Sequence, residues 1–158
     1  MIDLDVEQLK NDWCGHTFDT VHIPVKAEEI VEFAAACGET EPRYTDPSDP
    51  DFQAPPSYSA RFHGGRAMPK DFPIKSHQGF DAGKCVYVRG PLRAGDTVTA
   101  KSEIHDIYTK TGRSGGMLFI VHRMTFTNQK DEPVSIVDWK LVQNQVSARS
   151  KGEPGGSE

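Results

Sequence analysis

The sequence predicts an α+β protein in which one antiparallel β-sheet wraps around a helix. The first part of the chain holds a segment of alternating residues and then a segment with helical periodicity. The second part holds four long alternating segments, separated by RGPLRAGD, TKTGRSGG and NQKDE. These separators have the Gly, Pro, Asn and Asp residues typical of turns. A strand, a helix and an antiparallel meander together give the α+β class.

The first elements follow from periodicity and from helix-ending residues. An amphipathic segment covers residues 6–13, and the alternating residues 18–25 predict a strand that stops at Pro24. Residues 26–37 place apolar side chains at helical spacing, with acidic residues in the first turn and Gly38 directly after the last one. We therefore expect a helix of about three turns here.

The middle of the chain is rich in residues that interrupt regular structure. Residues 39–56 contain five prolines, so we expect a shaped loop without regular structure. The next segment, SYSARFHGGRAMPKDFP, suits a short helix, but Gly64-Gly65 and Pro69 limit it to one or two turns.

The meander supplies the remaining strands, which we expect at residues 84–88, 97–108, 117–127 and 133–142. Residues 147–158, SARSKGEPGGSE, contain no side chain able to anchor them and are expected to form a disordered tail. The chain of 158 residues fits one domain, over residues 1–146.

Composition excludes several classes of partner. A net charge of -5 disfavours nucleic acid and anionic membranes. No apolar run approaches the roughly 20 residues that span a bilayer, and the acidic start is unlike a signal peptide, so the expected location is cytoplasmic. Cys14, Cys37 and Cys85 lack disulfide or zinc spacing; we expect no metal, and buried structural thiols at Cys37 and Cys85.

Two segments resemble the MaoC-like dehydratase family. FAAACGETEPRYTDP resembles a helix that ends in the family's S-G-D-x-N-P-x-H loop, and VRGPLRAGDTVTAKSEI resembles its P-x-x-x-G-D turn followed by the long central strand. The resemblance covers roughly residues 18–142 and implies a single hot-dog fold. It also implies hydration or dehydration of an acyl thioester, on CoA or on an acyl-carrier protein, without a cofactor.

The chain departs from that family at the positions of its chemistry. Glu39 stands at the Asp position, Glu41 at the Asn position and Tyr44 at the His position. A Tyr with an ordinary pKa near 10 is a poor proton shuttle at pH 7. Pro55-Pro56 aligns where the family has a Gly whose N–H polarises the thioester carbonyl, and proline has no N–H.

These replacements resemble the FAS1-like, N-terminal half of MaoC dehydratases, in which a degenerate hot dog pairs with a catalytic one. The resemblance implies a non-catalytic subunit of an (R)-specific enoyl-thioester hydratase or 3-hydroxyacyl-thioester dehydratase, which acts as a hydro-lyase within a complex. The alternatives are a self-sufficient homodimeric hydratase and an acyl-thioester binding or scaffold module without chemistry. The expected assembly is a homodimer, or a heterodimer with a catalytic MaoC-like subunit.

Seven residues are candidates for the site. The catalytic candidates are Glu39, Tyr44 and His77, and the substrate-binding candidates are Pro56, Ser57, Arg89 and Arg93. Glu39 and Tyr44 can form a pair over a thioester, or they can be a solvated acid and a packing aromatic. Arg89 and Arg93 flank Pro91 in a turn where guanidinium groups can meet a phosphate. Asp96 is expected to fix that turn by accepting backbone hydrogen bonds.

Overall fold

A computed structural model describes residues 2–74, 79–112, 115–144 and 146–148. The elements in chain order are β1 (Ile2–Leu4), α1 (Val6–Trp13), β2 (Thr17–Pro24), α2 (Ala27–Ala36), α3 (Pro42–Thr45), the 3₁₀ turn η1 (Tyr58–Arg61), β3 (Phe80–Val88), β4 (Thr97–Gly112), β5 (Gly115–Thr127), β6 (Pro133–Asn144) and β7 (Val146–Ala148).

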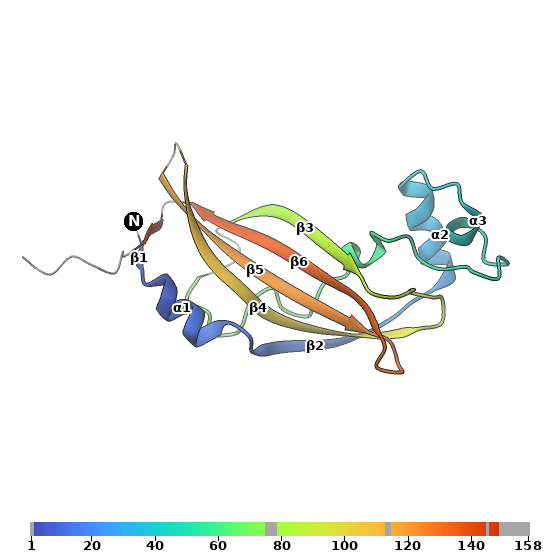
Figure 1. Ribbon diagram of the computed structural model, residues 1–158, viewed down its shortest axis with the longest axis horizontal. Helices are drawn as coiled ribbons and strands as arrows, with labels where there is room; N and C mark the ends of the chain where they lie inside the picture. Colours follow the sequence, from blue (N-terminus) through green and yellow to red (C-terminus); the bar gives the residue numbers. More distant parts are fainter. Residues whose placement is uncertain (1, 75–78, 113–114, 145, 149–158) are drawn as a thin grey trace, which may run out of the picture.

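Five strands form one curved antiparallel sheet in the order β2-β4-β5-β6-β3, with β2 and β3 at its edges. Figure 1 shows the sheet bending along its length, with α1 near one end and α2 and α3 beyond the other. The predicted α+β class and the single antiparallel sheet are therefore confirmed, but the meander covers only β4, β5 and β6, because β3 pairs with β6 and not with β4. A separate small pair joins β1 and β7 in parallel.

The hairpin of β4 and β5 is longer than the sequence pattern predicts. The ladder continues past Tyr108 to the pair Gly112 and Gly115, although this stretch reads as a turn. Tyr108 and Phe119 stack across the strands with ring centroids 5.0 Å apart, and the Lys110 ammonium lies 5.3 Å from the Phe119 ring centre. Such cross-strand contacts stabilise pairing despite the glycines.

The segment on the inner face of the sheet is mostly irregular. The central position holds the single turn η1, within the one or two turns that the Gly and Pro residues allow, so the described residues of this segment form no long central helix. Side chains from residues 52–62 pack against β4, β5 and β6 in one apolar cluster, and Phe72 and Ile74 join a second cluster with the far ends of the strands. Two apolar clusters thus lie along one face.

The helices begin and end where local chemistry favours it. The Asp5 carboxylate accepts a hydrogen bond from the Gln8 amide at the start of α1, at 3.0 Å. Gly38 follows α2 with a φ of 73°, a conformation in which a Cβ is strained. α2 buries Ile30 and Ala34 completely and confirms the predicted helix.

Four expectations need correction. The Pro-rich stretch contains the short helix α3, since Pro42 suits a first helical position. The strand expected from residue 84 begins at Phe80, because a bulge near Gly83 allows pairing to resume. Cys37 is exposed at the end of α2, not buried.

The fourth correction concerns the end of the chain. Ser147 and Ala148, counted in the expected tail, pair with β1, while residues 149–158 lie outside the described part. In the described part of the chain, no helix is long and apolar enough to cross a membrane.

Candidate functional site

A cavity of about 50 Å³ lies at the end of edge strand β3, and we call it the edge cavity. Its walls come from Tyr44 of α3, residues 53–56 and 58–59, residues 88 and 90–92, and Val134 and Ser135 of β6. The Ala54 amide donates to the Leu92 carbonyl at 2.8 Å, and the backbone amides of Arg89 and Gly90 both donate to the Val134 carbonyl. These backbone bonds hold three separate segments around one space.

The polar groups of the edge cavity are hydroxyl and amide groups. Ser59 Oγ and Ser135 Oγ are buried and have no hydrogen-bond partner among the described residues. Among the described residues that line this cavity, none is His, Asp, Glu, Lys or Arg. The cavity can therefore accept or donate hydrogen bonds to a bound group, but it lacks a side chain suited to proton transfer near pH 7.

The structure brings one of the three catalytic candidates to this cavity. Tyr44 is half-buried in its wall, with the Arg43 guanidinium 4.9 Å from its ring centre. Glu39 follows α2, where its amide donates to the Ala34 carbonyl at 2.9 Å, and it lines none of the three cavities found in the described part. His77 lies outside the described residues.

The binding candidates Pro56 and Ser57 have different surroundings. Pro56 lines the edge cavity beside Pro55, whereas Ser57 is exposed and does not line it. The Tyr58 amide donates to the Pro55 carbonyl at 2.9 Å and begins η1. Two prolines in the wall supply no N–H to a bound carbonyl at these positions.

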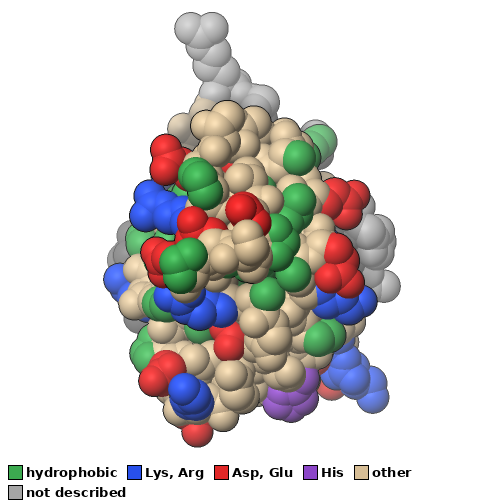
Figure 2. Space-filling model, turned by 90° about the vertical axis from the view of Figure 1, so that its right-hand side faces the viewer, with side chains coloured by type: hydrophobic (Ala, Val, Ile, Leu, Met, Phe, Trp, Pro, Cys, Tyr) green, Lys and Arg blue, Asp and Glu red, His purple; other side chains and the backbone are tan. Residues whose placement is uncertain are grey.

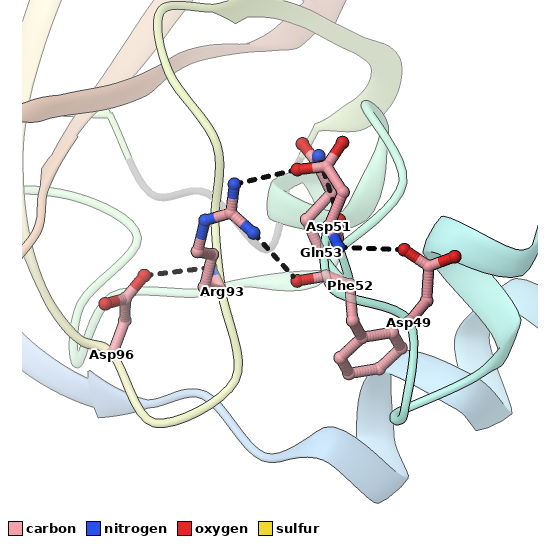
Figure 3. A network of polar contacts seen from close by, with 6 residues as sticks. All are labelled: Asp49, Asp51, Phe52, Gln53, Arg93 and Asp96. Atoms are coloured by element: carbon pink, nitrogen blue, oxygen red, sulfur yellow. Dashed lines mark hydrogen bonds and ion pairs between the residues drawn. The ribbon is translucent and has the colours of Figure 1, made fainter.

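Arg93 holds the loop that borders the edge cavity. Its guanidinium donates to the Phe52 carbonyl at 3.2 Å and to the Asp51 carboxylate at 2.9 Å (Figure 3). The Asp96 carboxylate accepts from the Arg93 amide at 2.8 Å, which confirms the predicted turn-fixing role of Asp96. Arg93 therefore fixes the position of the loop at residues 51 and 52.

Arg89 differs from Arg93 because it is exposed at the end of β3. Its guanidinium lies 6.0 Å from the ring centre of Tyr87, which is exposed too. Of the two guanidinium groups, that of Arg89 is the one placed to meet a phosphate in solvent.

The turn η1 is tied to α2 by a charged network. Tyr58 is fully buried, and its hydroxyl accepts a hydrogen bond from Arg61 at 2.8 Å. Arg61 also pairs with Glu29 of α2 at 3.2 Å. Burial raises the pKa of the Tyr58 hydroxyl above its ordinary value, although Arg61 opposes the shift, so Tyr58 is a neutral packing residue at neutral pH.

The sequence reasoning missed the polar residues on the inner face. Ser59, Ser135 and His122 were not among the candidates. The alternation of side chains along a strand could have found two of them. Ser135 shares a face with Val137, and His122 shares one with Met124 and Phe126. A polar residue at an inward position marks a hydrogen-bonding site or a cavity. In the described part of the chain, no three His, Cys, Asp or Glu side chains gather as metal ligands.

Edge strand β3 carries the exposed large apolar residues of the molecule's described part. Phe80, Tyr87 and Val88 are 62%, 43% and 50% exposed, and Val88 also lines the edge cavity. Figure 2 looks onto the end of the molecule where α2 and α3 lie, and shows further apolar side chains in the middle of that end, with charged side chains around them. An unpaired strand edge with apolar side chains is a surface on which another chain can pair.

Comparison with solved structures identifies the fold. The chain is 20% identical to a chain of the C-terminally truncated HadBC (3R-hydroxyacyl-ACP dehydratase) complex of Mycobacterium tuberculosis, with a TM-score of 0.61 over 82% of this chain and 93% of that one. A chain of the ChsH1-ChsH2 complex of the same organism is 21% identical, with a TM-score of 0.63 over 87% of this chain and 92% of that one. The MaoC-like dehydratase of Rhodospirillum rubrum is 20% identical, with a TM-score of 0.58 over 89% of this chain and 96% of that one. A search of curated protein sequences found no match.

The curved five-stranded antiparallel sheet is therefore the hot-dog fold of MaoC-like dehydratases. A family model of the FAS1-like, dehydratase domain region matches residues 12–137, which is more than half of the chain. The chain belongs to this FAS1-like dehydratase domain family. The predicted fold and family are both confirmed.

Proposed function

We propose that this chain is the non-catalytic subunit of an (R)-specific enoyl-thioester hydratase or 3-hydroxyacyl-thioester dehydratase. In this proposal it forms one wall of the acyl-thioester site, and a partner hot dog supplies the proton-transfer groups. The observation that carries the proposal is the lining of the edge cavity, where the described residues include two tyrosines and no imidazole or carboxylate. Syn addition of water to an enoyl thioester needs such a group near neutral pH.

The position of the edge cavity supports a shared site. Val88 belongs both to the exposed edge of β3 and to the cavity wall, so a strand that pairs with β3 brings its own loops close to the cavity. Ser59 and Ser135 offer two hydroxyls that can hydrogen-bond a thioester or an amide of its carrier arm. Arg89 is the candidate for a carrier phosphate.

The two complexes in the comparison supply further support by analogy. HadBC and ChsH1-ChsH2 are each a complex of two named components, and HadBC is a 3R-hydroxyacyl-ACP dehydratase. A cytoplasmic location and a thioester on CoA or carrier protein belong to the same proposal. The self-sufficient enzyme is less well supported, because of its two described candidates Tyr44 lines the edge cavity and Glu39 does not.

The test is a hydration assay on crotonyl-CoA with the full chain alone and with a co-purified hot dog that has an intact D-x-N-P-x-H loop. We expect the chain alone to be slower than the complex by roughly 10²–10⁴-fold, because an aligned acid/base group is missing. In the complex, Tyr44→Phe should change the rate only modestly, whereas replacing the partner's loop His should abolish it.

The outcomes separate the three functions. Ordinary enzymatic rates from the chain alone, lost in Tyr44→Phe or His77→Ala, would show a self-sufficient homodimeric hydratase. Thioester binding without turnover, with or without the partner, would show a binding or scaffold module. Either result overturns the proposal.

A further inference from the structure

A second cavity, of about 110 Å³, lies between the two apolar clusters on the inner face, and we call it the central cavity. The sheet supplies His122 and Met124 of β5 and Trp139 of β6, and residues 63–67 supply the opposite wall. His122 and Trp139 are paired across β5 and β6, so their side chains share this face.

The walls of the central cavity contain buried polar atoms without completed hydrogen bonds. His122 is only 1% exposed, and neither of its ring nitrogens has a hydrogen-bond partner among the described residues. The Ala67 backbone lies close enough to raise the pKa of His122, but its geometry does not give a hydrogen bond to either ring nitrogen. Trp139 Nε1 is unpartnered in the same way.

Ser102 adds a hydroxyl next to this group. Its Oγ is also buried without a partner among the described residues, and it lies 3.0 Å from the point where a Cβ on Gly64 would stand. A buried polar group without a hydrogen bond is destabilising, and native structures leave few of them. The groups of His122 and Trp139 line one cavity, which indicates that a bound molecule completes their bonds.

The wall opposite the sheet is held in place from two sides. The Asp19 carboxylate of β2 accepts from the Gly65 amide at 2.7 Å and from the Arg66 amide at 3.2 Å. Lys84 of β3 donates to the Ala60 carbonyl at 2.7 Å. His63 and Arg66 are exposed at the rim, so solvent reaches the cavity between fixed walls.

The chemistry of the walls defines the ligand. Burial lowers the pKa of His122 to about 4, so at neutral pH its ring offers one N–H and one lone pair. Trp139 Nε1 adds a donor, and Met124 and Ala67 add apolar surface. Among the described residues that line this cavity there is no Asp, Glu or Lys, and Arg66 and His63 are exposed at its rim, which favours an uncharged ligand inside.

We propose that the central cavity binds a small neutral molecule or group with an apolar body and one hydroxyl. A hydroxyl can accept from Trp139 Nε1–H and donate to the lone pair of one His122 ring nitrogen, while the apolar body covers the Met124 and Ala67 surface that water alone would leave poorly solvated. An apolar cavity of 150 Å³ holds benzene, so 110 Å³ open at the rim suits a group of about five or six heavy atoms.

The central cavity is distinct from the edge cavity. The two cavities share no lining residue, and Ser135 of the edge cavity lies about 13 Å along β6 from Trp139 of the central cavity. The proposal for the central cavity therefore holds whether or not the chain serves an acyl-thioester hydratase.

The test uses the full chain with ¹⁵N-labelled histidine and tryptophan, followed by NMR during titration with cyclopentanol. Methylcyclopentane has the same shape without the hydroxyl, and acetate tests for an anion. We expect cyclopentanol to shift the His122 and Trp139 side-chain signals and to bind roughly tenfold more tightly than methylcyclopentane, because only the alcohol completes the hydrogen bonds.

Two variants assign the site. His122→Leu should remove the preference for the alcohol, whereas His105→Gln, at an exposed histidine of β4, should leave it unchanged. If His122→Leu does not fold, Trp139→Phe, which removes only the indole donor, should weaken cyclopentanol binding. Equal binding of the alcohol and the hydrocarbon, tighter binding of acetate, or no shift with any probe would overturn the proposal; in the last case the cavity holds water.

Discussion

Gly64 shows how one residue sets the distance between the inner segment and the sheet. A Cβ at this position would stand 2.8 Å from Asp19 Oδ2 and 3.0 Å from Ser102 Oγ. Asp19 cannot move freely, because its Oδ2 already accepts two backbone hydrogen bonds. We expect Gly64→Ala to lower the free energy of unfolding by roughly 1–3 kcal/mol, as overpacking does.

The neighbouring glycine provides the control. A Cβ on Gly65 would meet Asp19 oxygens at 3.5 Å, an ordinary contact, so Gly65→Ala should change stability by less than Gly64→Ala. Urea denaturation of both variants measures the difference. Equal stability of the two alanine variants would show that the inner segment is not held at this point.

At single residues, sequence predicts local roles better than long-range ones. Asp96 was correctly expected to fix its turn, because its partner amide at Arg93 is three residues away. Arg93 was one of two candidates for a phosphate, and its contact with Asp51 could not be predicted, because the chain brings the two residues close only on folding. Ser135 and His122 were missed for the same reason, because the sheet register decides which side chains they face, and Ser59 was missed because its turn packs against the sheet only on folding.

At the scale of elements, periodicity predicted which strands exist but not where each ends. The hairpin of β4 and β5 extends beyond Tyr108, where it was expected to end, because stacking of Tyr108 on Phe119 stabilises the strand pairing. β3 starts early because the bulge at Gly83 lets its first residues pair with β6. Cross-strand contacts and bulges decide both boundaries, and neither is visible in local propensity.

β3 also carries the prediction that belongs to elements. We expect the wild-type chain to self-associate or to bind a partner through this edge, and F80K/Y87K to weaken that association, because two charges on an exposed apolar strand edge oppose pairing. The matched control is T20K/H22K on β2, the other edge strand, at two exposed positions. Light scattering at micromolar concentration measures the mass.

Either of two results would contradict this prediction. A wild-type chain that stays monomeric and captures no hot-dog partner would remove the need for an interface. Equal loss of association in F80K/Y87K and T20K/H22K would place the interface elsewhere.

At the scale of the whole molecule, the buried imidazole makes stability depend on pH. His122 lies among groups from several elements: Asp19 of β2 favours its protonation, whereas Lys84 of β3 and His63 oppose it. Burial dominates and lowers its pKa to about 4 from an ordinary 6.5. Because the unfolded chain then binds more protons between these values, stability rises with pH across this window and is lost as pH falls.

We therefore expect the free energy of unfolding to fall by roughly 2 kcal/mol between pH 7.5 and pH 5 through His122 alone. The contribution is fully present above about pH 6.5 and declines as pH falls toward 4, where the native ring begins to take up a proton. His122→Leu should remove this part of the slope, while His105→Gln, at an exposed site on β4, should retain it. Urea denaturation of the three proteins at both pH values gives the comparison. If the free energy of unfolding changes equally with pH in wild type and His122→Leu, the pKa of His122 is not lowered in the folded state. A group near the ring would then stabilise its protonated form, and a bound anion in the central cavity would be the candidate to look for next.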